Sequence, residues 1–524
     1  MTATSAAPAA GWELALEGWR LYAVVAACAF LIYVGALWNG FALDDRAIIL
    51  QNPHVVARSG LWRVFLESYW RPEVGGHLYR PLTVVTYALD ALVDGAPWFH
   101  FVNLLWHAAA SVAVAAFARR SVGVAAGLAA GLIFAAHPVH VEAVANVIGR
   151  AELMVGLCSV LAVYAALGRQ SVAWSTAALA VGLLSKENAA TIPAIIACGW
   201  LVGIGRPPRR KVAAFVATWA VIGVGYAAAR WAVLHQHTGF HEVAPVFSGA
   251  GPVPVRLTAI AELADIGRLL IFPLTLRVDY SPAERTLVTS PLDGRFLLGL
   301  ACLAIWGALL GHAWRRRRRV EALGLAWIAI AYLPVANLLF PSGVLVAERT
   351  LYAPSIGLTL ALGAWLARLE LRRAALVGGL LALAGAVRSA VRVPVWHDDL
   401  SVVLSILEDS PASYRGPQYT AMSLQARRMP EKALEDYLIA FQIFDRDSRV
   451  LIGAADAAWT LHRSALADSL MGQARERCGR CEASLRNQAA AALVRGDTAV
   501  ADSLLNQLQV VETRQNRRFR KISR

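Results

Sequence analysis

Long apolar runs separated by short polar clusters occupy most of this 524-residue chain, and they limit its fold more than any other feature. They extend from about residue 20 to residue 390, and after Trp396 the sequence becomes charged and loses them. Only 16% of the residues are charged, against about 25% in an average soluble protein. A run of about 20 apolar residues can cross a bilayer as a helix. The sequence therefore predicts an all-α, polytopic membrane bundle followed by a domain in water.

Eleven segments are candidates for membrane-spanning helices. The first apolar run, Leu21 to Trp38, has no usual cleavage site after it and is predicted to be a retained signal-anchor. Two more apolar helices, near 81–94 and 257–273, carry many polar groups and are expected at the interface or as re-entrant pieces. The predicted spans are 20–38, 98–118, 121–136, 149–168, 171–184, 188–204, 211–233, 296–314, 322–340, 351–368 and 372–389.

Basic clusters between the apolar runs predict the orientation. If residues 1–19 are cytoplasmic, alternation through eleven spans puts every basic cluster on the cytoplasmic side, as the positive-inside rule requires. The clusters are Arg119-Arg120, Arg169, Arg206 to Lys211, Arg315 to Arg319 and Arg368 to Arg373. The net charge of +14 is thus interpreted as a topology signal, not as a nucleic-acid surface. We expect a multi-pass protein of the inner (plasma) membrane with a membrane domain over 20–390, a first external loop over 39–97, and residues 391–524 in the periplasm or outside the cell.

The same alternation places six polar clusters on the other, non-cytoplasmic face. Ionisable groups at the ends of membrane helices usually face a bundle interior or a water-filled cavity, so these clusters predict one cavity there. Solvated loop charges are the alternative. The clusters are Asp44 to Arg46, His77 to Arg80, His137 to Arg150, Ser185 to Asn188, Asp279-Tyr280 and Glu348-Arg349.

Asp44 and Asp45 begin the first external loop. A carboxylate pair can accept the proton of a hydroxyl or hold a divalent cation. Either residue could instead cap a helix.

Two histidines and a glutamate, His137, His140 and Glu142, lie within six residues. They could bind a metal together with Asp45, donate hydrogen bonds to a phosphate, or serve as core and capping residues.

Four basic residues are candidates for binding a phosphate, because arginine binds phosphate with two hydrogen bonds and lysine binds it as a point charge. The cations best placed for it are Arg80, Arg150, Lys186 and Arg349. A polyprenyl phosphate would present that group beside apolar walls. The run Arg315 to Arg319 lies on the opposite side and is predicted to be only topogenic.

The tail repeats with a period of 34 residues. Ala433, Ala467 and Ala501 occupy equivalent places in three helix-turn-helix units, the period of tetratricopeptide arrays. A generic helical bundle is the alternative. Such arrays bind extended peptides on a concave surface, which implies a protein partner. For Cys478 and Cys481 we favour a structural disulfide or no role over a redox or metal site.

Several motifs in order resemble the transmembrane and tetratricopeptide repeat-containing (TMTC) family of O-mannosyltransferases. The resemblance extends over nearly all of residues 20–400, and the repeat tail agrees with it. The motifs are Phe41 to Ile48 with Asn52, Tyr79 to Thr83, Phe99 to His107, His137 to Val144 with Gly149 to Glu152, Ser185 to Asn188, Val278 to Ser281, Ala336 to Leu338 with Pro341, and Ala347 to Ser355.

This resemblance implies a GT-C type fold, a polyprenyl-phosphate-linked mannose donor, and inverting transfer to Ser or Thr hydroxyls of exported proteins. It implies that Asp44 and Asp45 are the catalytic acids, with Asp44 first as the base, and that Arg80, Arg150, Lys186 and Arg349 bind the donor phosphate. The residues expected to shape the donor and acceptor sites are His107, His137, His140, Glu142, Glu187, Glu348 and Tyr352. A divalent metal stays an open alternative, and the short tail and a bacterial composition leave the sugar and acceptor open.

Two other functions compete with this one. A transporter or flippase of lipid-linked sugars would usually carry its charges near the membrane midplane within inverted repeats, and neither feature is evident. A non-catalytic scaffold presenting the repeat domain would not need eleven spans and six polar clusters.

Overall fold

A computed structural model gives the fold of the chain. It describes residues 18–57, 60–70, 78–235, 243–271, 273–478, 502 and 505. Over these residues every regular element is a helix. The fold class is therefore helical, as predicted.

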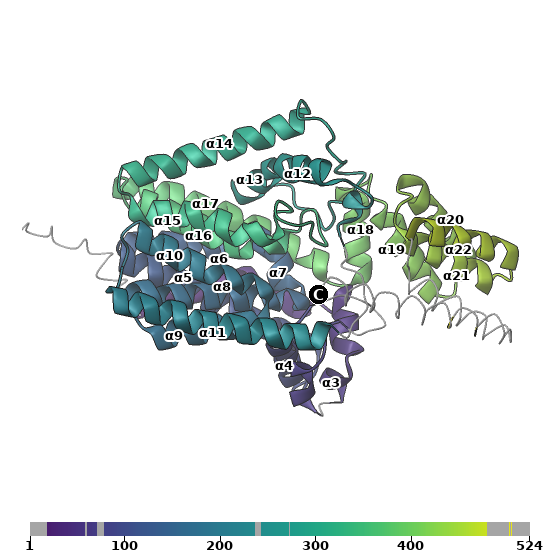
Figure 1. Cartoon of the computed structure of the whole chain (residues 1–524), viewed down its shortest axis with the longest axis horizontal. Coiled ribbons are helices and arrows are strands. Elements are labelled where there is room, and N and C mark those ends of the chain that lie inside the picture. The colour runs from purple at the N-terminus through teal and green to yellow at the C-terminus, as the bar shows by residue number, and fades with distance from the viewer. Residues whose placement is uncertain are drawn as a thin grey trace, which may run out of the picture.

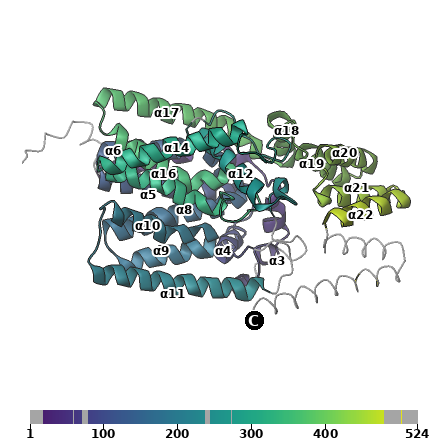
Figure 2. The ribbon, with the colours of Figure 1, turned by 45° about the horizontal axis from the view of Figure 1, so that its top comes forward.

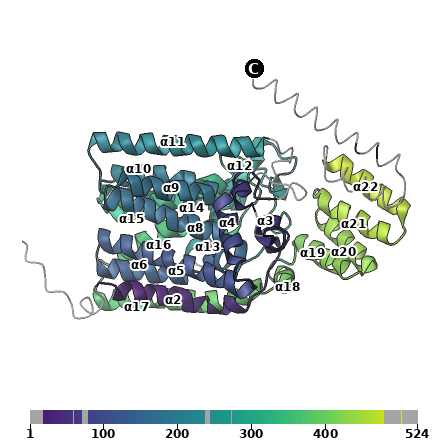
Figure 3. The same cartoon turned by 90° about the horizontal axis from the view of Figure 1, so that it is seen from below.

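A bundle of apolar helices forms the larger part of the molecule, and the remaining helices extend from one of its ends (Figure 1). Figures 2 and 3 show α11 along one edge of the bundle and α17 along the opposite edge. The helices of this part are α2 (Arg20–Ile32), α3 (Pro53–Val56), α4 (Pro81–Asp90), α5 (Ala96–Ser121), α6 (Val124–Ala136), α7 (Val141–Ala145), α8 (Arg150–Val163), α9 (Val172–Ser185), α10 (Ile192–Leu201), α11 (Arg209–Leu234), α12 (Pro252–Ala261), α13 (Leu263–Ile271), α14 (Gly294–Arg315), α15 (Arg319–Tyr332), α16 (Tyr352–Leu366) and α17 (Leu371–Arg392).

Five helical segments of the described chain are long and apolar enough to cross a membrane, or six if one bent pair is a single span. The bent pair is α6 with residues 138–145, at an angle of 50°, where Pro138 removes a helical hydrogen bond. The five segments are Ala96–Ser121, Val147–Gly168, Arg209–Leu234, Gly294–Arg315 and Leu371–Trp396. These are the helices of a membrane protein, but the predicted count of eleven is not confirmed. Helices α10, α15 and α16 form where spans were predicted, yet each is shorter than a bilayer needs.

The helices at the centre of the bundle are much more buried than those at its edges. In the apolar stretch of Val147–Gly168, which contains α8, 78% of the residues are buried, against 11% in Arg209–Leu234 and 6% in Leu371–Trp396. Glycine allows the closest packing, since a Cβ on Gly324 of α15 would collide with the backbone of Gly357 of α16. Such contacts between small residues are typical of membrane helices.

The basic clusters gather at one end of the bundle, here called the basic end. Arg119 donates to the carbonyl of Gly18 at 2.9 Å, and Arg120 to that of Gly168 at 2.8 Å. Arg368 pairs with Glu321 at 3.0 Å. This is the left-hand end in Figure 1, away from the C-terminal helices. The six polar clusters alternate with the basic ones along the chain, and their described residues lie at the opposite end, here called the polar end. The predicted separation of charge is therefore present.

The C-terminal helices begin at the polar end. They are α18 (Asp399–Asp409), α19 (Arg415–Ala426), α20 (Pro430–Ile443), α21 (Ser448–Thr460) and α22 (Ser464–Cys478). Ala433 in α20 and Ala467 in α22 are both fully buried, at the positions that the 34-residue period makes equivalent. Two helix pairs thus follow the predicted spacing. Ala501 and Cys481 lie outside the described residues, as does the side chain of Cys478, so the tetratricopeptide array and the disulfide stay predictions.

Polar contacts fix the first tail helices to the bundle. Ser413 donates to the Asp279 carboxylate at 2.7 Å, and Ser410 donates to the Asp279 carbonyl at 2.9 Å. The backbone N–H of Ala412 donates to Glu284 at 2.9 Å. The tail is therefore joined directly to the polar end.

Candidate functional site

The two adjacent carboxylates of the first loop have different surroundings. Asp44 is exposed, whereas the side chain of Asp45 is buried, with the residue 1% exposed. Asp45 accepts hydrogen bonds from the backbone N–H groups of Ala42 at 3.1 Å and Ile148 at 2.9 Å. Asp45 therefore joins the first loop to the start of α8, and Asp44 is the carboxylate that an external substrate can reach.

Asp399 of α18 holds this loop from the other side. Its carboxylate accepts the N–H of Leu43 at 2.7 Å and pairs with Arg46 at 2.9 Å. Leu43 itself has a φ of 48°, a left-handed conformation that is rare for a leucine. Asp399 of the C-terminal segment therefore holds the backbone before Asp44 and the side chain that follows Asp45.

Burial raises the pKa of Asp45 to about 7, against the lowering effect of its two N–H donors. Because this value lies above the ordinary 3.8, ionising Asp45 costs folding free energy. The stability that its neutral form contributes is lost as pH rises from about 4 to about 7.

We therefore expect Asp45→Asn, which cannot ionise, to flatten the fall of apparent Tm between about pH 4 and pH 7. Thermal unfolding of the detergent-solubilised protein at several pH values measures this slope. Asp468→Asn, at an exposed position of α22, serves as the control and should keep the wild-type slope. An unchanged slope in Asp45→Asn would contradict this assignment.

All four predicted phosphate-binding cations form ion pairs, and three of them keep some exposed surface at the polar end. Arg80 holds Glu187 with two hydrogen bonds of 3.0 and 2.6 Å. Lys186 pairs with Glu152, and Arg349 pairs with Glu142. The backbone N–H of Arg349 also donates to Glu142 at 2.8 Å. The side chain of Arg349 remains 30% exposed, that of Arg80 13% and that of Lys186 8%. Arg349 is thus the most accessible cation of the three.

Electrostatic interactions connect Asp44 with these groups. The carboxylate of Glu142, followed by those of Asp44 and Glu152, raises the pKa of Arg349. Burial raises the pKa of Tyr419 in α19, and the charge of Asp44 adds to that effect. Asp44 therefore lies within electrostatic range of both the exposed cation and the first helix pair of the tail.

Glu348 is buried beside this cluster. Its carboxylate accepts the N–H of Arg277 at 2.6 Å and the hydroxyl of Tyr280 at 2.8 Å. Burial, together with the nearby charge of Glu142, raises the pKa of Glu348 to about 8. Glu348 therefore orders the segment that precedes Arg349.

Arg150 is enclosed at the base of the polar end. Its side chain has no exposed surface and pairs with Asp90. It also donates to Asn103 at 2.7 Å and to the carbonyl of Phe99 at 2.9 Å, and its guanidinium carbon lies 4.8 Å from the centre of the Tyr87 ring. Arg150 thus ties α4, α5 and α8 together and does not share the accessible surface of Arg349.

The predicted histidines form part of a buried hydrogen-bonded cluster with α16. His107 contacts the Ala135 carbonyl at 3.1 Å, so its Nε2 carries the proton and its Nδ1 accepts the Tyr352 hydroxyl at 2.9 Å. The Ser355 hydroxyl donates to the Tyr352 carbonyl, so His140 Nε2 donates to Ser355 at 2.7 Å. These contacts fix α16, and hence Arg349 just before it, against α5 and residues 137–140.

The four candidate metal ligands have different partners and do not form one cluster. His137 donates to the Leu270 carbonyl at 2.9 Å, while His140, Glu142 and Asp45 have the separate partners given above. Within the described residues, no group of three or more His, Cys, Asp or Glu side chains could hold a metal ion.

Sequence reasoning assigned no role to three acidic residues that form ion pairs at or beside the site. Asp90 pairs with Arg150, Glu152 with Lys186, and Asp399 with the loop of Asp44. The sequence does contain a signal for Asp90 and Glu152, because burying an acidic residue within an apolar segment costs free energy unless it has a partner. Nothing local in the sequence indicates Asp399, which is distant from the first loop along the chain.

Comparison with known proteins finds relatives that are named protein O-mannosyl-transferases. TMTC3 of Mus musculus is 27% identical over 506 residues, which cover 86% of this chain and 54% of the relative. TMTC4 of Homo sapiens is 28% identical over 462 residues, with 74% and 61% covered. Tmtc2 of Drosophila melanogaster is 40% identical over 190 residues, with 32% and 20% covered.

The chain spans about half the length of the curated relatives that it matches. No family model matches the chain, and no solved structure matches it. The chain is thus a homologue of the TMTC protein O-mannosyl-transferases, at 26–40% identity.

Proposed function

We propose that this protein is a membrane glycosyltransferase of GT-C type that moves a sugar, mannose by analogy with its relatives, from a polyprenyl phosphate to Ser or Thr hydroxyls of exported proteins. The observation that carries the proposal is the exposed carboxylate of Asp44 within electrostatic range of Arg349, at the end of the bundle that bears the repeat helices. The polar end faces away from the cytoplasm in this proposal, because the basic clusters are at the other end.

In the proposed reaction Asp44 accepts the proton of the acceptor hydroxyl. The hydroxyl oxygen forms a bond to the anomeric carbon as the bond from that carbon to the phosphate oxygen breaks, and the configuration inverts. The electron pair of the broken bond leaves with the polyprenyl phosphate. Arg349 stabilises the charge that develops there, and a charge-assisted bond of this kind is most effective in a site that excludes water.

The other cations take different parts in this proposal. Arg80 and Lys186 are each paired with a carboxylate and mostly buried. In this proposal they add to the positive potential of the site and do not contact the leaving phosphate first. Arg150, which is fully enclosed, acts as a positioning residue for α4, α5 and α8. The histidine cluster positions α16, and no step requires a metal.

Replacing Arg349 by glutamine is expected to lower kcat/KM for the lipid-linked donor by about 100-fold, because the leaving phosphate loses its cation. Arg349→Lys should retain part of the activity, since it keeps the charge but not the planar fork. Initial rates of sugar transfer at varied donor concentration measure both.

Arg368→Gln is the matched control for Arg349→Gln, because Arg368 also pairs with a buried glutamate, Glu321, but at the basic end. It should keep the wild-type rate. Equal losses in the Arg349 and Arg368 variants would mean that the effect is structural and would remove Arg349 from the proposed chemistry.

The experiment that tests the function uses the full chain in lipid vesicles with polyprenyl-phosphate mannose and a Ser/Thr-rich peptide. Mannose on the peptide, measured by mass spectrometry, is the expected result. Movement of the lipid-linked sugar between leaflets is followed in the same vesicles. Movement without transfer would favour a flippase, and neither activity with any lipid-linked sugar would favour a scaffold.

A further inference from the structure

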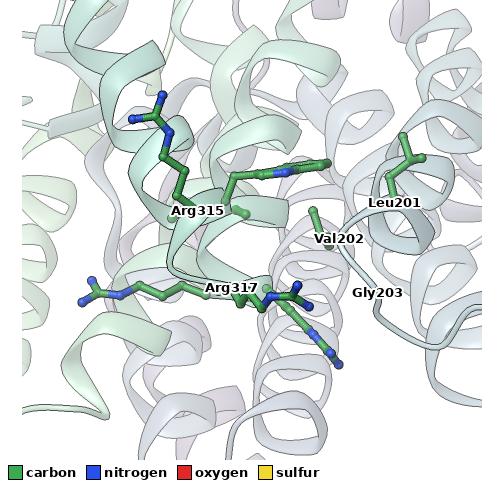
Figure 4. Close-up of a pocket in the computed structure, with 10 residues that line it drawn as sticks. Leu201, Val202, Gly203, Arg315 and Arg317 are labelled. Carbon is green, nitrogen blue, oxygen red and sulfur yellow. The ribbon is translucent and has the colours of Figure 1, made fainter.

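A second site is present at the basic end, far from Asp44. It is a pocket of about 440 Å³ between the turn that follows α10 and the turn that joins α14 to α15, and its volume lies within the range of about 300–1,000 Å³ typical of small-ligand sites. Figure 4 shows Leu201, Val202 and Gly203 facing Arg315 and Arg317 across it. Its lining residues are Leu201, Val202, Gly203, Ala313, Trp314, Arg315, Arg317, Arg318, Arg319 and Ala322.

The positive charge of this pocket is not neutralised by the described part of the protein. Arg318 lies 3.6 Å from Glu321, which Arg368 also pairs with at 3.0 Å. Among the described residues, Arg315, Arg317 and Arg319 have no ion-pair or side-chain hydrogen-bond partner. Three arginines without an acidic partner in the described chain line one concave surface and create a positive potential that attracts an anion. The fork of a guanidinium group suits phosphate oxygens.

The turn of Gly203 brings the third arginine into the pocket. Gly203 has a φ of 85°, which favours glycine, and the guanidinium carbon of Arg319 would lie 3.5 Å from a Cβ at that position. Arg319 therefore packs over this glycine. The arginines of 315–319 thus line a pocket together with the turn that follows α10.

Apolar groups next to the arginines point to a ligand that is itself part of the membrane. Leu201 is 70% exposed and Trp314 is 50% exposed, and Trp is typical of membrane interfaces. The pocket is at the end of α14, one of the helices able to cross the bilayer. A ligand there would place its phosphate among the arginines and its acyl chains along the exposed apolar side of α14.

We propose that this pocket binds the phosphate-bearing head group of an anionic membrane lipid, in the leaflet at the basic end. Basic pockets between membrane helices are suited to such head groups. This site is independent of the proposed sugar transfer, and a lipid held there would fix α10 against α14 and α15.

Native mass spectrometry of the full detergent-solubilised chain tests the proposal, with phosphatidylglycerol, phosphatidylcholine or inorganic phosphate added as probes. We expect one phosphatidylglycerol to bind more tightly than phosphatidylcholine. The triple variant Arg315→Gln, Arg317→Gln, Arg319→Gln should bind it at least about tenfold more weakly. The matched control removes three exposed charges of the same end that do not line the pocket, Arg209→Gln, Arg210→Gln, Lys211→Gln, and should keep the affinity.

A second variant covers the case in which loss of the arginines disturbs membrane insertion. Arg315→Lys, Arg317→Lys, Arg319→Lys keeps the charge that orients the chain but loses the forks, so its affinity should fall severalfold. Wild-type affinity in both triple variants, or an equal loss in the control, would overturn the proposal in favour of general surface attraction. Inorganic phosphate that displaces the lipid at equal concentration would overturn it in favour of a free anion.

Discussion

Asp44→Asn is expected to reduce sugar transfer by about 100- to 10,000-fold while leaving the apparent Tm unchanged. The expected size is that of a lost general base. Asparagine has the same shape as aspartate but cannot accept the hydroxyl proton at neutral pH. Because Asp44 is exposed, its replacement leaves no unpaired charge in the core. The loss should appear in kcat and not in KM for the donor.

Two companion variants separate this chemistry from structure. Asp45→Asn should change the pH dependence of stability, since its buried carboxylate joins two backbone segments. Asp468→Asn in the tail should change neither transfer nor stability. If Asp44→Asn transfers sugar at the wild-type rate, Asp44 is not the base.

Arg150→Met is expected to destabilise the protein by about 3–5 kcal/mol, the cost of breaking a buried ion pair at one partner. The change leaves the Asp90 carboxylate, 7% exposed, without its cation, and leaves the Asn103 oxygen and the Phe99 carbonyl without their donors. Thermal or denaturant unfolding in detergent measures the loss.

The double variant Arg150→Met, Asp90→Leu should lose less than the sum of the two single variants, because it removes both buried charges. Arg268→Met is the surface control. Its side chain is 33% exposed beside Asp265, and a pair of that kind contributes about 0–1 kcal/mol. If Arg150→Met lost no more unfolding free energy than Arg268→Met, the ion pair of Arg150 would not be the buried, stabilising contact described here.

The separation of the chain into two chemically different ends could be predicted from the sequence. Short loops carry the signal, since Arg119-Arg120 and Arg315 to Arg319 alternate with Asp44-Asp45 and Glu348-Arg349 along the chain. Antiparallel neighbouring helices must bring alternate loops to the same end, so no long-range information is needed. The helical fold follows for the same reason, because hydrocarbon requires the backbone to satisfy its own hydrogen bonds.

The lengths of the membrane-spanning helices could not be predicted from the sequence. Hydropathy of residues 188–204 does not reveal that the α-helix there starts only at Ile192. Hydropathy also does not show whether α6 and residues 138–145, which meet at a bend of 50°, form one span. Buried helices need not cross the bilayer alone, because protein and not lipid surrounds them. The count of eleven took each of these apolar runs as one crossing of the bilayer.

The partners and the burial of individual side chains could not be predicted from the sequence. Asp44 and Asp45 are equivalent in sequence, and only the fold buries one and exposes the other. Arg150 and Arg349 were assigned the same task, but the first is enclosed by α4 and α5 while the second keeps an exposed face. Such differences depend on contacts between residues distant along the chain, such as Asp45 with Ile148 and Arg349 with Glu142, for which no local pattern exists.

The most direct test of the proposed function is to determine on which side of the membrane the sugar is transferred to the peptide. Sealed vesicles of defined orientation, containing the full chain and polyprenyl-phosphate mannose, are given a Ser/Thr-rich peptide that cannot cross the membrane. Mannose is expected on the peptide when the polar end, with Asp44, Arg349 and the repeat helices, faces the added peptide. Transfer only to peptide added at the basic end would contradict it.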